Sequence, residues 1–451
     1  MTLHLYDYQS RAVDTIIEHF EAGSKVVMLD APPGCGKTWI AEGLRQKLGA
    51  SGLYLAHSRV LQKQLKGDFP HAEVLEGKAN YPVYYQSRFP GATCDDCTGK
   101  AGCQFCPSRF ECPYKQARND AVMADLACLN YDLILSLVGY ANDSSFCGRG
   151  LVVCDEGEIL EDRMMSHVSV RVSRRIMERL GLSPPERKTQ EAAAKCGSWT
   201  SWCRDVAPKI RRLRDGYGEA TMEQRREKRR LERLARSLEH IAGEKLEERW
   251  VLTGYDAGFV EFKPVYVEEH ASRLLWPISD RFLFMSGTLI SPRHVAQDLG
   301  LEDRDGKELV PWSVVSVPSQ FDRRRRPVFY DPVGSVTRKT KEAMGPVLAN
   351  KILQILAKHH GERVLVHSHS YHLTKMIVDG IVGKTVRPVF SYYNSRDREA
   401  AVEGFKETEG SVLVAPSLER GISLDGDLAR VVVLAKVPYL DLGDKQVSAR
   451  T

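Results

Sequence analysis

No apolar stretch of this 451-residue sequence approaches the roughly 18 residues that a membrane-spanning helix needs. That absence excludes a membrane-spanning protein, and 43% apolar with 27% charged residues is typical of soluble globular chains. The first residues, MTLHLYDYQS, lack the basic and apolar segments of a secretory leader, so we expect a cytoplasmic location. Internal repeats and low-complexity tracts are also absent, and the length predicts two or three folding units.

Cysteine is scarce except in one segment. Of the 11 cysteines, five lie between Cys94 and Cys112, in the string CDDCTGKAGCQFCPSRFEC. A secreted disulfide framework is the usual explanation of such density, but in a chain of this length without a recognisable leader we expect binding of a metal ion or a metal cluster instead. Zinc is one candidate because C-x-x-C occurs twice. Only five residues separate the two pairs, however, whereas roughly 15–20 separate them in zinc ribbons.

The net charge of +5 is distributed unevenly. Residues 204–236 hold twelve Arg or Lys against six Asp or Glu, so this segment accounts for the whole positive excess. Such a segment is typical either of a surface that binds a polyanion or of a solvated basic helix without a partner.

Short apolar runs that end in Gly, Pro or polar residues recur along the chain, with helical periodicity in their flanks. They form two groups, one that reaches about Thr288 and one that starts at about Arg326. Strands that alternate with helices predict an α/β fold with parallel sheets, here in two domains. The runs are KVVMLDAP, GLYLAH, LVVCDEGE and RFLFMSGT, then RVLVHSHS, PVFSYY, SVLVAPS and RVVVLAKVP.

Between about Ser166 and Trp250 the periodicity changes to that of helices. Apolar residues recur every three or four positions in two runs, which the string DGYG separates, and this pattern predicts a helical hairpin. The apolar positions are Trp199, Trp202, Val206, Ile210 and Leu213, then Leu231, Leu234, Leu238 and Ile241.

The string DAPPGCGKTWI follows an apolar strand and opens a helix, which is the context of a phosphate-binding loop. Its spacing matches G-x-x-x-x-G-K-[ST], except that Ala31 replaces the first glycine. Gly34 and Gly36 would let backbone N–H groups approach the phosphates, Lys37 would reach the β- and γ-phosphates of ATP, and Thr38 would offer its hydroxyl to Mg²⁺. The predicted nucleotide-binding residues of the loop are Gly34, Cys35, Gly36, Lys37 and Thr38.

A second acidic element is expected at another strand end. The string LVVCDEGEIL places Asp155 and Glu156 directly after four apolar residues. Asp155 would hold Mg²⁺, through water, and Glu156 would orient and deprotonate the attacking water. Together with the phosphate-binding loop, this pair predicts ATP hydrolysis.

The order of these motifs resembles that of the superfamily 2 helicases of the XPD/DinG type, which carry an iron–sulfur cluster and move 5′ to 3′ on single-stranded DNA. DYQSRAV resembles the glutamine element that reads adenine, which nominates Gln9, and LYLAHSRVLQKQL resembles the segment that grips the DNA backbone. DEGE stands where the family has D-E-A-H, so Glu158 replaces a histidine that couples the nucleotide to movement.

Two later strings extend the resemblance. FMSGTLIS resembles the element that links hydrolysis to DNA, carried here by Ser286, Gly287 and Thr288. SLERGISLDGD resembles the fifth helicase element, which nominates Arg420 as a catalytic residue, although Ser423 stands where an aspartate is usual. The final family motif, Q-x-x-G-R-x-x-R, does not occur before Thr451.

The resemblance implies two RecA-like motor domains, the first interrupted by a cysteine-rich insertion and by a helical, arch-like insertion. The implied boundaries are 1–80, 120–165 and 251–295 for the first motor domain, 81–119 for the cluster insertion, 166–250 for the arch and 320–451 for the second motor domain.

The resemblance also assigns the clustered cysteines to a [4Fe–4S] cluster, for which four thiolates are suitable ligands. The surrounding strings NYPVYYQ, CPYKQAR and LACLNYDL resemble those of the family, but Val83 occupies the usual position of the first ligand. The favoured ligands are Cys97, Cys103, Cys106 and Cys112, with Cys94 as the substitute, and zinc is the alternative metal.

The implied function is an ATP-dependent DNA helicase or translocase, expected to be a monomer, that acts on single-stranded or forked duplex DNA. The alternative is an ATP-gated nucleic-acid-binding module with little turnover, because Glu158 and Ser423 depart from the family pattern. Aromatic residues near the cysteines could stack on bases or simply pack on the surface. They are Tyr81, Tyr84, Tyr85 and Phe105.

Overall fold

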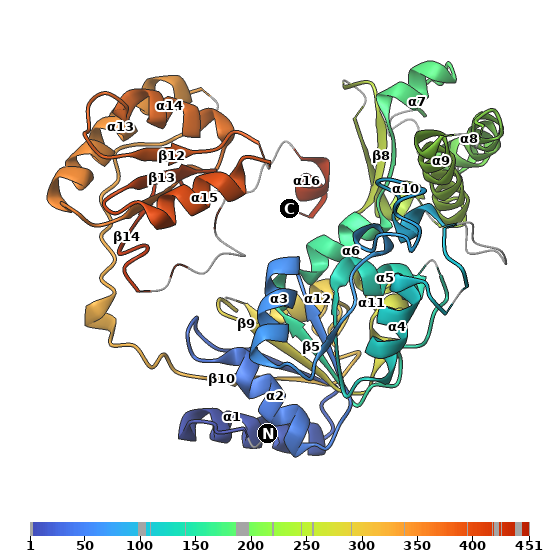
Figure 1. The fold of residues 1–451 in the computed structure, drawn as a ribbon, viewed down its shortest axis with the longest axis horizontal. Coiled ribbons are helices and arrows are strands. Elements are labelled where there is room, and N and C mark those ends of the chain that lie inside the picture. The colour runs from blue at the N-terminus through green and yellow to red at the C-terminus, as the bar shows by residue number, and fades with distance from the viewer. Residues whose placement is uncertain are drawn as a thin grey trace. The chain divides into compact units, whose positions relative to one another are not determined.

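The structure is a computed structural model of the chain. It describes residues 3–450 except 98–104, 109, 140, 186–197, 219–220, 245, 255–256, 290, 338, 395, 417, 419–423, 425 and 438–443. The chain forms two compact units, one of residues 1–321 together with 442–451 and one of residues 322–441. Each unit is an α/β structure, so the predicted fold class is confirmed (Figure 1).

The first unit is built on a seven-stranded sheet with the strand order β10-β1-β9-β5-β2-β4-β3, and all of its pairings are parallel. The central strands are nearly continuous apolar runs because helices cover both faces of the sheet. The strands are β1 (Val26–Asp30), β2 (Gly52–Ala56), β3 (Glu73–Val74), β4 (Leu126–Asn130), β5 (Leu151–Asp155), β9 (Phe282–Ser286) and β10 (Trp312–Ser316).

Alternate residues of these strands enter two separate apolar cores, one on each face of the sheet. In β1, Val26 and Met28 join one core, whereas Val27 and Leu29 join the other. The helices of this part are α1 (Asp7–Glu21), α2 (Lys37–Lys47), α3 (Arg59–Asp68), α4 (Pro113–Met123), α5 (Tyr131–Gly139), α6 (Leu160–Val168), α11 (Glu268–Leu274) and α12 (Pro292–Asp298). Short 3₁₀ turns lie at Lys78–Asn80, Cys94–Asp96, Gly157–Ile159 and Trp276–Ile278.

The predicted helical hairpin is confirmed as α8 (Ser198–Asp215) and α9 (Met222–Ile241), which lie side by side in Figure 1 and pack closely. Its apolar positions enter a third core, which the hairpin shares with a small antiparallel sheet of strand order β6-β8-β7. The remaining elements of this part are α7 (Arg174–Arg179), α10 (Leu246–Arg249), β6 (Val170–Val172), β7 (Trp250–Thr253) and β8 (Val260–Pro264). Residues 251–264, assigned from the sequence to the first motor domain, therefore pair with this insertion, because β8 completes its sheet.

The second unit is a four-stranded parallel sheet of order β12-β13-β11-β14. Val364 and Val366 of β11 enter one apolar core and Leu365 enters the other, so both faces of this sheet are also covered. The elements are a 3₁₀ turn at Arg323–Arg325, α13 (Lys341–Lys358), β11 (Val364–His367), α14 (Tyr371–Ile381), β12 (Val389–Ser391), α15 (Arg398–Glu407), β13 (Val412–Ala415) and β14 (Val431–Leu434).

The last helix, α16 (Lys445–Arg450), groups with the first unit rather than with residues 322–441. Among the helices described, none is long and apolar enough to cross a membrane.

Candidate functional site

Three predicted motifs meet at one edge of the seven-stranded sheet. β9 lies between β1 and β5, with Ser286 opposite Asp30 and Met285 opposite Asp155. Because all three strands are parallel, their carboxyl ends open on the same edge, which is where open α/β sheets bind ligands. The phosphate-binding loop after β1, the acidic pair after β5 and the Ser-Gly-Thr element after β9 are thereby brought together.

The phosphate-binding loop has the geometry that its two glycines permit. Gly34 has φ +81° and Gly36 has φ +75°, a left-handed conformation that costs residues with a side chain roughly 1–2 kcal/mol. Gly36 is the N-cap of α2, so the loop ends at the positive end of an 11-residue helix. Unpaired N–H groups and the helix dipole both favour a bound phosphate at this point.

Lys37 starts α2 and turns back towards its own loop. Its Nζ donates a hydrogen bond to the carbonyl of Ala31 at 3.1 Å. A methyl group at Gly287 would come within 3.4 Å of the same Nζ, so the Ser-Gly-Thr element approaches the lysine closely. Lys37 thus lies between the phosphate-binding loop and the Ser-Gly-Thr element, where its positive charge can attract a phosphate group.

Gln9, predicted to read adenine, contacts the phosphate-binding loop. Its Nε2 donates to the carbonyl of Cys35 at 3.0 Å, and its Oε1 accepts from the backbone N–H of Tyr6 at 2.9 Å. The hydroxyl of Tyr8 donates to the same Cys35 carbonyl at 3.1 Å. Both ends of the Gln9 amide are therefore engaged within the chain, and the side chain braces the loop.

Asp155 is buried at the end of β5 and held by two tyrosines. The hydroxyl of Tyr54 donates to its Oδ2 at 2.8 Å, and the hydroxyl of Tyr131 donates to its backbone carbonyl at 2.7 Å. Burial raises the pKa of Asp155, and the hydrogen bond from Tyr54 opposes that increase. Tyr54 thus helps to keep the carboxylate ionised, which is the form that can hold a cation.

Glu156 follows in a left-handed conformation, with φ +51°. A non-glycine residue in this region is strained, and such strain clusters at functional sites. Its Oε2 lies 2.7 Å from Nδ1 of His57, the residue that directly follows β2. Glu158, which replaces the family histidine, lies in the 3₁₀ turn immediately after Glu156.

Tyr54 and His57 were not predicted as site residues. Both belong to the string LYLAHSRVLQKQL, which the resemblance assigned to DNA contact, and β2 lies beside β5 in the sheet. A polar residue at the carboxyl end of an apolar strand was the available signal for His57. Tyr54 gave none, because it lies within the apolar strand itself.

Of the remaining residues predicted for the ATP site, some are described by the structure and others are not. Thr38 lies in the first turn of α2, and Ser286 is buried at the end of β9, where its Oγ accepts from the backbone N–H of Thr288 at 3.1 Å. Arg420 and Ser423, together with Gly421, lie outside the described residues.

The structure brings several of the clustered cysteines into one apolar core. Sγ of Cys94 lies 3.8 Å from Sγ of Cys112, Cys106 is buried in the same core, and Cys97 packs against it half-buried. Burial, together with the neighbouring thiols, raises the pKa of Cys94 to about 12. Cys103 lies outside the described residues, and within the described ones no group of three or more His, Cys, Asp or Glu is arranged to hold a metal ion.

The chemistry of this donor set is nevertheless that of a thiolate-bound group. Three cysteines are buried together, and coordination of a metal deprotonates a thiol to the thiolate that binds it. The residues fit either an iron–sulfur cluster or zinc.

Asp96, between two of these cysteines, binds the helical hairpin. Its Oδ1 and Oδ2 each accept from Arg226 at 2.9 Å, and Arg229 donates to Oδ1 at 2.8 Å. Burial alone would raise the pKa of Asp96, but the hydrogen bonds from Arg226, the Thr93 backbone and Arg229 outweigh it and lower the pKa. This contact joins the cysteine segment to α9, and no pattern in the sequence indicated it.

The contact also accounts for part of the basic segment 204–236. Several of its other arginines form ion pairs with acidic residues of the same hairpin: Arg211 with Glu232 and Glu239, Arg214 with Asp215 and Glu232, Arg230 with Glu227, and Arg236 with Glu232. Lys209, Arg212 and Arg233 are exposed, and no ion pair joins them to the part of the chain that the structure describes.

The four aromatic candidates near the cysteines differ in exposure. Phe105 is buried against Phe89, and Tyr81 packs edge-on against Tyr114. Tyr84 is 53% exposed and lies edge-on to Tyr85. Of the four, Tyr84 presents the most accessible ring.

Comparisons with known proteins agree with this geometry. Residues 2–94 match the family model of the type III restriction enzyme res subunit, and residues 352–451 match that of a helicase C-terminal domain. UvrABC system protein B of Streptococcus mutans is 31% identical over 81 residues, and that of Streptococcus thermophilus is 30% identical over 81 residues. Each match covers 17% of this chain and 12% of the relative, so the chain spans a small part of the curated relatives it matches.

Solved structures cover far more of the chain. The structure of S. tokodaii Xpd4 is 16% identical, with a TM-score of 0.57 over 99% of this chain and 86% of that one. A structure named XPD_APO is 15% identical, with a TM-score of 0.59 over 97% of this chain and 86% of that one. The chain therefore shares its fold with these two structures, which agrees with the fold class that its motifs predicted.

Proposed function

We propose that this protein is an ATP-dependent DNA helicase or translocase that couples ATP hydrolysis to movement along single-stranded DNA. The observation that carries the proposal is the meeting of the phosphate-binding loop, the Asp155–Glu156 pair and the Ser-Gly-Thr element at one sheet edge. The 5′ to 3′ direction and the preference for DNA over RNA rest on the family resemblance.

In this proposal the α2 N-terminus and Lys37 bind the phosphates, and Lys37 exchanges its carbonyl partner for them. Glu156 takes the proton of the attacking water as that oxygen bonds to the γ-phosphorus and the bond to the β-phosphate oxygen breaks. His57, 2.7 Å from Glu156, orients the carboxylate. Asp155 and Thr38 would hold Mg²⁺, which would neutralise charge that develops on the phosphates. Arg420 would complete the catalytic set.

The cysteine segment would hold a [4Fe–4S] cluster, with Cys97, Cys103, Cys106 and Cys112 as the proposed ligands and Cys94 as the substitute. Sγ of Cys94 lies 3.8 Å from Sγ of Cys112, so Cys94 is close enough to serve as a ligand in place of Cys97. A bound cluster would supply rigidity to a segment that is rich in loops. The Asp96 contact would carry that rigidity to α9.

Single-stranded or forked DNA would be bound without sequence reading. Lys209, Arg212 and Arg233 are exposed cations of the hairpin, and cations of this kind suit phosphate contacts. Tyr84 offers an exposed ring on which a base could stack. We propose a cytoplasmic monomer.

The deciding experiment measures ATP turnover with and without single-stranded DNA. DNA should stimulate turnover, and Lys37→Ala should lower it by roughly 100-fold or more, as expected when a preorganised charge is removed from a transition state. Glu156→Gln should abolish turnover yet retain ATP binding. Turnover that DNA does not alter, or that survives Lys37→Ala, would contradict the proposal.

The second candidate function is an ATP-gated nucleic-acid-binding module with little turnover. It is favoured by Glu158, which stands in the turn after Glu156 where the family has its coupling histidine. In that case DNA affinity should depend on ATP while almost no phosphate is released.

The metal is decided by a separate measurement on anaerobically purified protein. A broad absorption shoulder near roughly 400 nm, with about four irons and matching acid-labile sulfide per chain, would support the cluster. A colourless protein with stoichiometric zinc would identify the alternative metal.

A further inference from the structure

The last described helix, α16, lies in the sequence range of the second domain but packs with the first unit. It lies within residues 352–451, which match a helicase C-terminal domain, yet it groups with the first unit. Residues 322–441 are therefore joined to the first unit at both of their ends.

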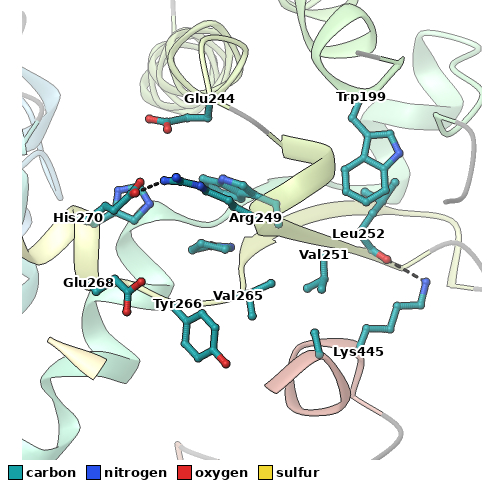
Figure 2. A pocket seen from close by; sticks show the side chains of 14 residues that line it. Trp199, Glu244, Arg249, Val251, Leu252, Val265, Tyr266, Glu268, His270 and Lys445 are labelled. Atoms are coloured by element: carbon teal, nitrogen blue, oxygen red, sulfur yellow. Dashed lines mark hydrogen bonds and ion pairs between the residues drawn. The ribbon is translucent and has the colours of Figure 1, made fainter. Parts of the chain in front are cut away.

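Two residues of α16 bind backbone carbonyls at the base of the helical insertion. Nζ of Lys445 donates to the carbonyl of Leu252 in β7 at 2.9 Å, which Figure 2 shows as a dashed line. Nε2 of Gln446 lies 3.3 Å from the carbonyls of Pro264, at the end of β8, and of Val265. These contacts hold α16 against the sheet that carries α8 and α9.

Arg450 links the same helix to α6. Its Nε donates to the carbonyl of Val265 at 2.7 Å, its guanidinium lies over the ring of Tyr266, and it forms an ion pair with Glu161. Glu161 is in the first turn of α6, the helix that follows Asp155, Glu156 and the 3₁₀ turn after them. Arg450 thus bridges the base of the insertion and α6, as does Gln446, whose Nε2 also lies 3.3 Å from Sδ of Met165 in α6.

This docking has the character of a reversible contact. No residue of α16 is buried, so polar groups rather than an apolar face hold the helix. Beside it lies a cavity of about 740 Å³, lined by Lys445, Ala449 and residues of β7, β8 and α11 (Figure 2). A helix that stands next to open space and buries little apolar surface can shift without a large loss of packing energy.

We propose that α16 is a latch through which movement of the second unit reaches both the helical insertion and α6, with Arg450 as its positioning residue. The inference rests on the proposed motor function, since a latch of this kind matters only if the second unit moves with the nucleotide. Arg450 itself contacts neither ATP nor DNA in this scheme. Its role is to make hydrolysis and movement of the insertion depend on each other.

The primary test counts base pairs separated per ATP hydrolysed on forked DNA. For Arg450→Ala we expect DNA-stimulated turnover near the wild-type rate and roughly 5-fold or more fewer base pairs per ATP, the lower range of coupling between sites. Glu161→Gln should give the same uncoupling, and combining the two should add little, because both remove one interaction. Arg450→Lys should restore part of the coupling.

Arg304→Ala is the matched control. Arg304 also lies over the Tyr266 ring, but it pairs with Glu268 and Asp298 and makes no contact with α16 among the described residues. It should leave the ratio of base pairs to ATP unchanged. Equal losses in the Arg304 and Arg450 variants, or parallel losses of turnover and strand separation, would assign Arg450 a merely structural role.

A second measurement needs no strand separation. Hydrogen exchange in α16, β7 and β8 should change when a non-hydrolysable ATP analogue binds the wild-type protein, and in β7 and β8 that response should be lost in Arg450→Ala. If the analogue binds without altering exchange there, the latch is overturned while the motor proposal stands. If DNA fails to stimulate wild-type turnover, the motor proposal fails first, and the exchange response still decides whether α16 senses nucleotide.

Discussion

The candidate ATP site and the contact between the cysteine segment and α9 both depend on polar groups, but they are assembled in different ways. At the sheet edge, backbone geometry places the functional groups, through two left-handed glycines and three parallel strand ends. At the cysteine segment, one carboxylate, Asp96, meets Arg226 and Arg229, which lie 130 and 133 positions further along the chain.

The two sites differ in which substitutions they tolerate. A site built from backbone depends on residues that permit a conformation, so a single methyl group can damage it. A site built from a few charged side chains depends on the ion pairs among them, so removing one partner takes away all of its hydrogen bonds at once. The predictions below test these two dependences from the largest expected effect to the smallest.

Asp96→Ala should have the largest effect on stability. It removes a carboxylate with a fully buried side chain that accepts from two arginines, so the free energy of unfolding should fall by about 3 kcal/mol, as measured by urea denaturation. Asp95→Ala is the control, because Asp95 is 41% exposed and lies 3.9 Å from Arg229. Its cost should stay below about 0.5 kcal/mol. Equal costs would mean that the Asp96 contact does not hold α9 in place.

Gly36→Ala should mainly weaken nucleotide binding. The residue has φ +75°, and its new Cβ would come 2.4 Å from Nε2 of Gln9, which must then leave the Cys35 carbonyl. A cost of about 2 kcal/mol predicts roughly 30-fold weaker ATP binding, measurable by titration calorimetry.

Gly49→Ala provides the matched control for that substitution. Gly49 follows the other end of α2 with φ +58°, and a Cβ there meets nothing within 4 Å. It should lower stability by about 1 kcal/mol and leave ATP affinity unchanged. Weakened ATP binding in both variants would show that helix strain, rather than loop geometry, is responsible.

Tyr54→Phe should shift the pH dependence of hydrolysis by a smaller amount. Loss of the 2.8 Å hydrogen bond removes a group that stabilises ionised Asp155, so the already raised pKa of Asp155 should rise further. The acid limb of the pH–rate profile should then move to higher pH. Tyr131→Phe, which loses a bond to the Asp155 backbone carbonyl, should move that limb less. A profile that does not move would show that Asp155 does not limit the rate at low pH.

The smallest expected effect concerns two histidines near the base of the insertion. Burial lowers the pKa of His167 and of His270 to about 4, whereas an unfolded histidine titrates near roughly 6.5. Between these two pKa values the histidines are protonated in the unfolded chain but neutral in the folded chain. The free energy of unfolding should therefore fall as the pH drops from 7 to 5. His167→Gln should reduce that fall by roughly 1 kcal/mol in denaturation at the two pH values. An unchanged fall would show that His167 is protonated in the folded protein.

Much of the fold was predictable because its signals are local. Apolar runs identified eight strands, and spacings of three and four identified the α8–α9 hairpin. Three strands of the first sheet were missed: β3 has only two residues, the string LACLN of β4 was noted only for its family resemblance, and WSVVS of β10 is short and mixed with polar residues. The sequence assigned residues 251–264 to the first motor domain, whereas in the structure they belong to the sheet of the helical insertion. The composition of β8 does not reveal this, because its place depends on its antiparallel partners β6 and β7.

The sequence by itself determined the local chemistry: a glycine loop of the phosphate-binding type, an acidic pair at a strand end and a group of thiols. These follow from residue type and spacing, because each chemical role needs neighbours only a few positions away. Only the tertiary structure decided which distant side chains support them, namely Tyr54 and His57 at the acidic pair, Arg226 and Arg229 at Asp96, and Arg450 at Glu161. Strand order and helix packing bring these side chains to their partners. Both depend on the burial of whole sheet and helix faces, so the residue at any one position does not reveal its partner.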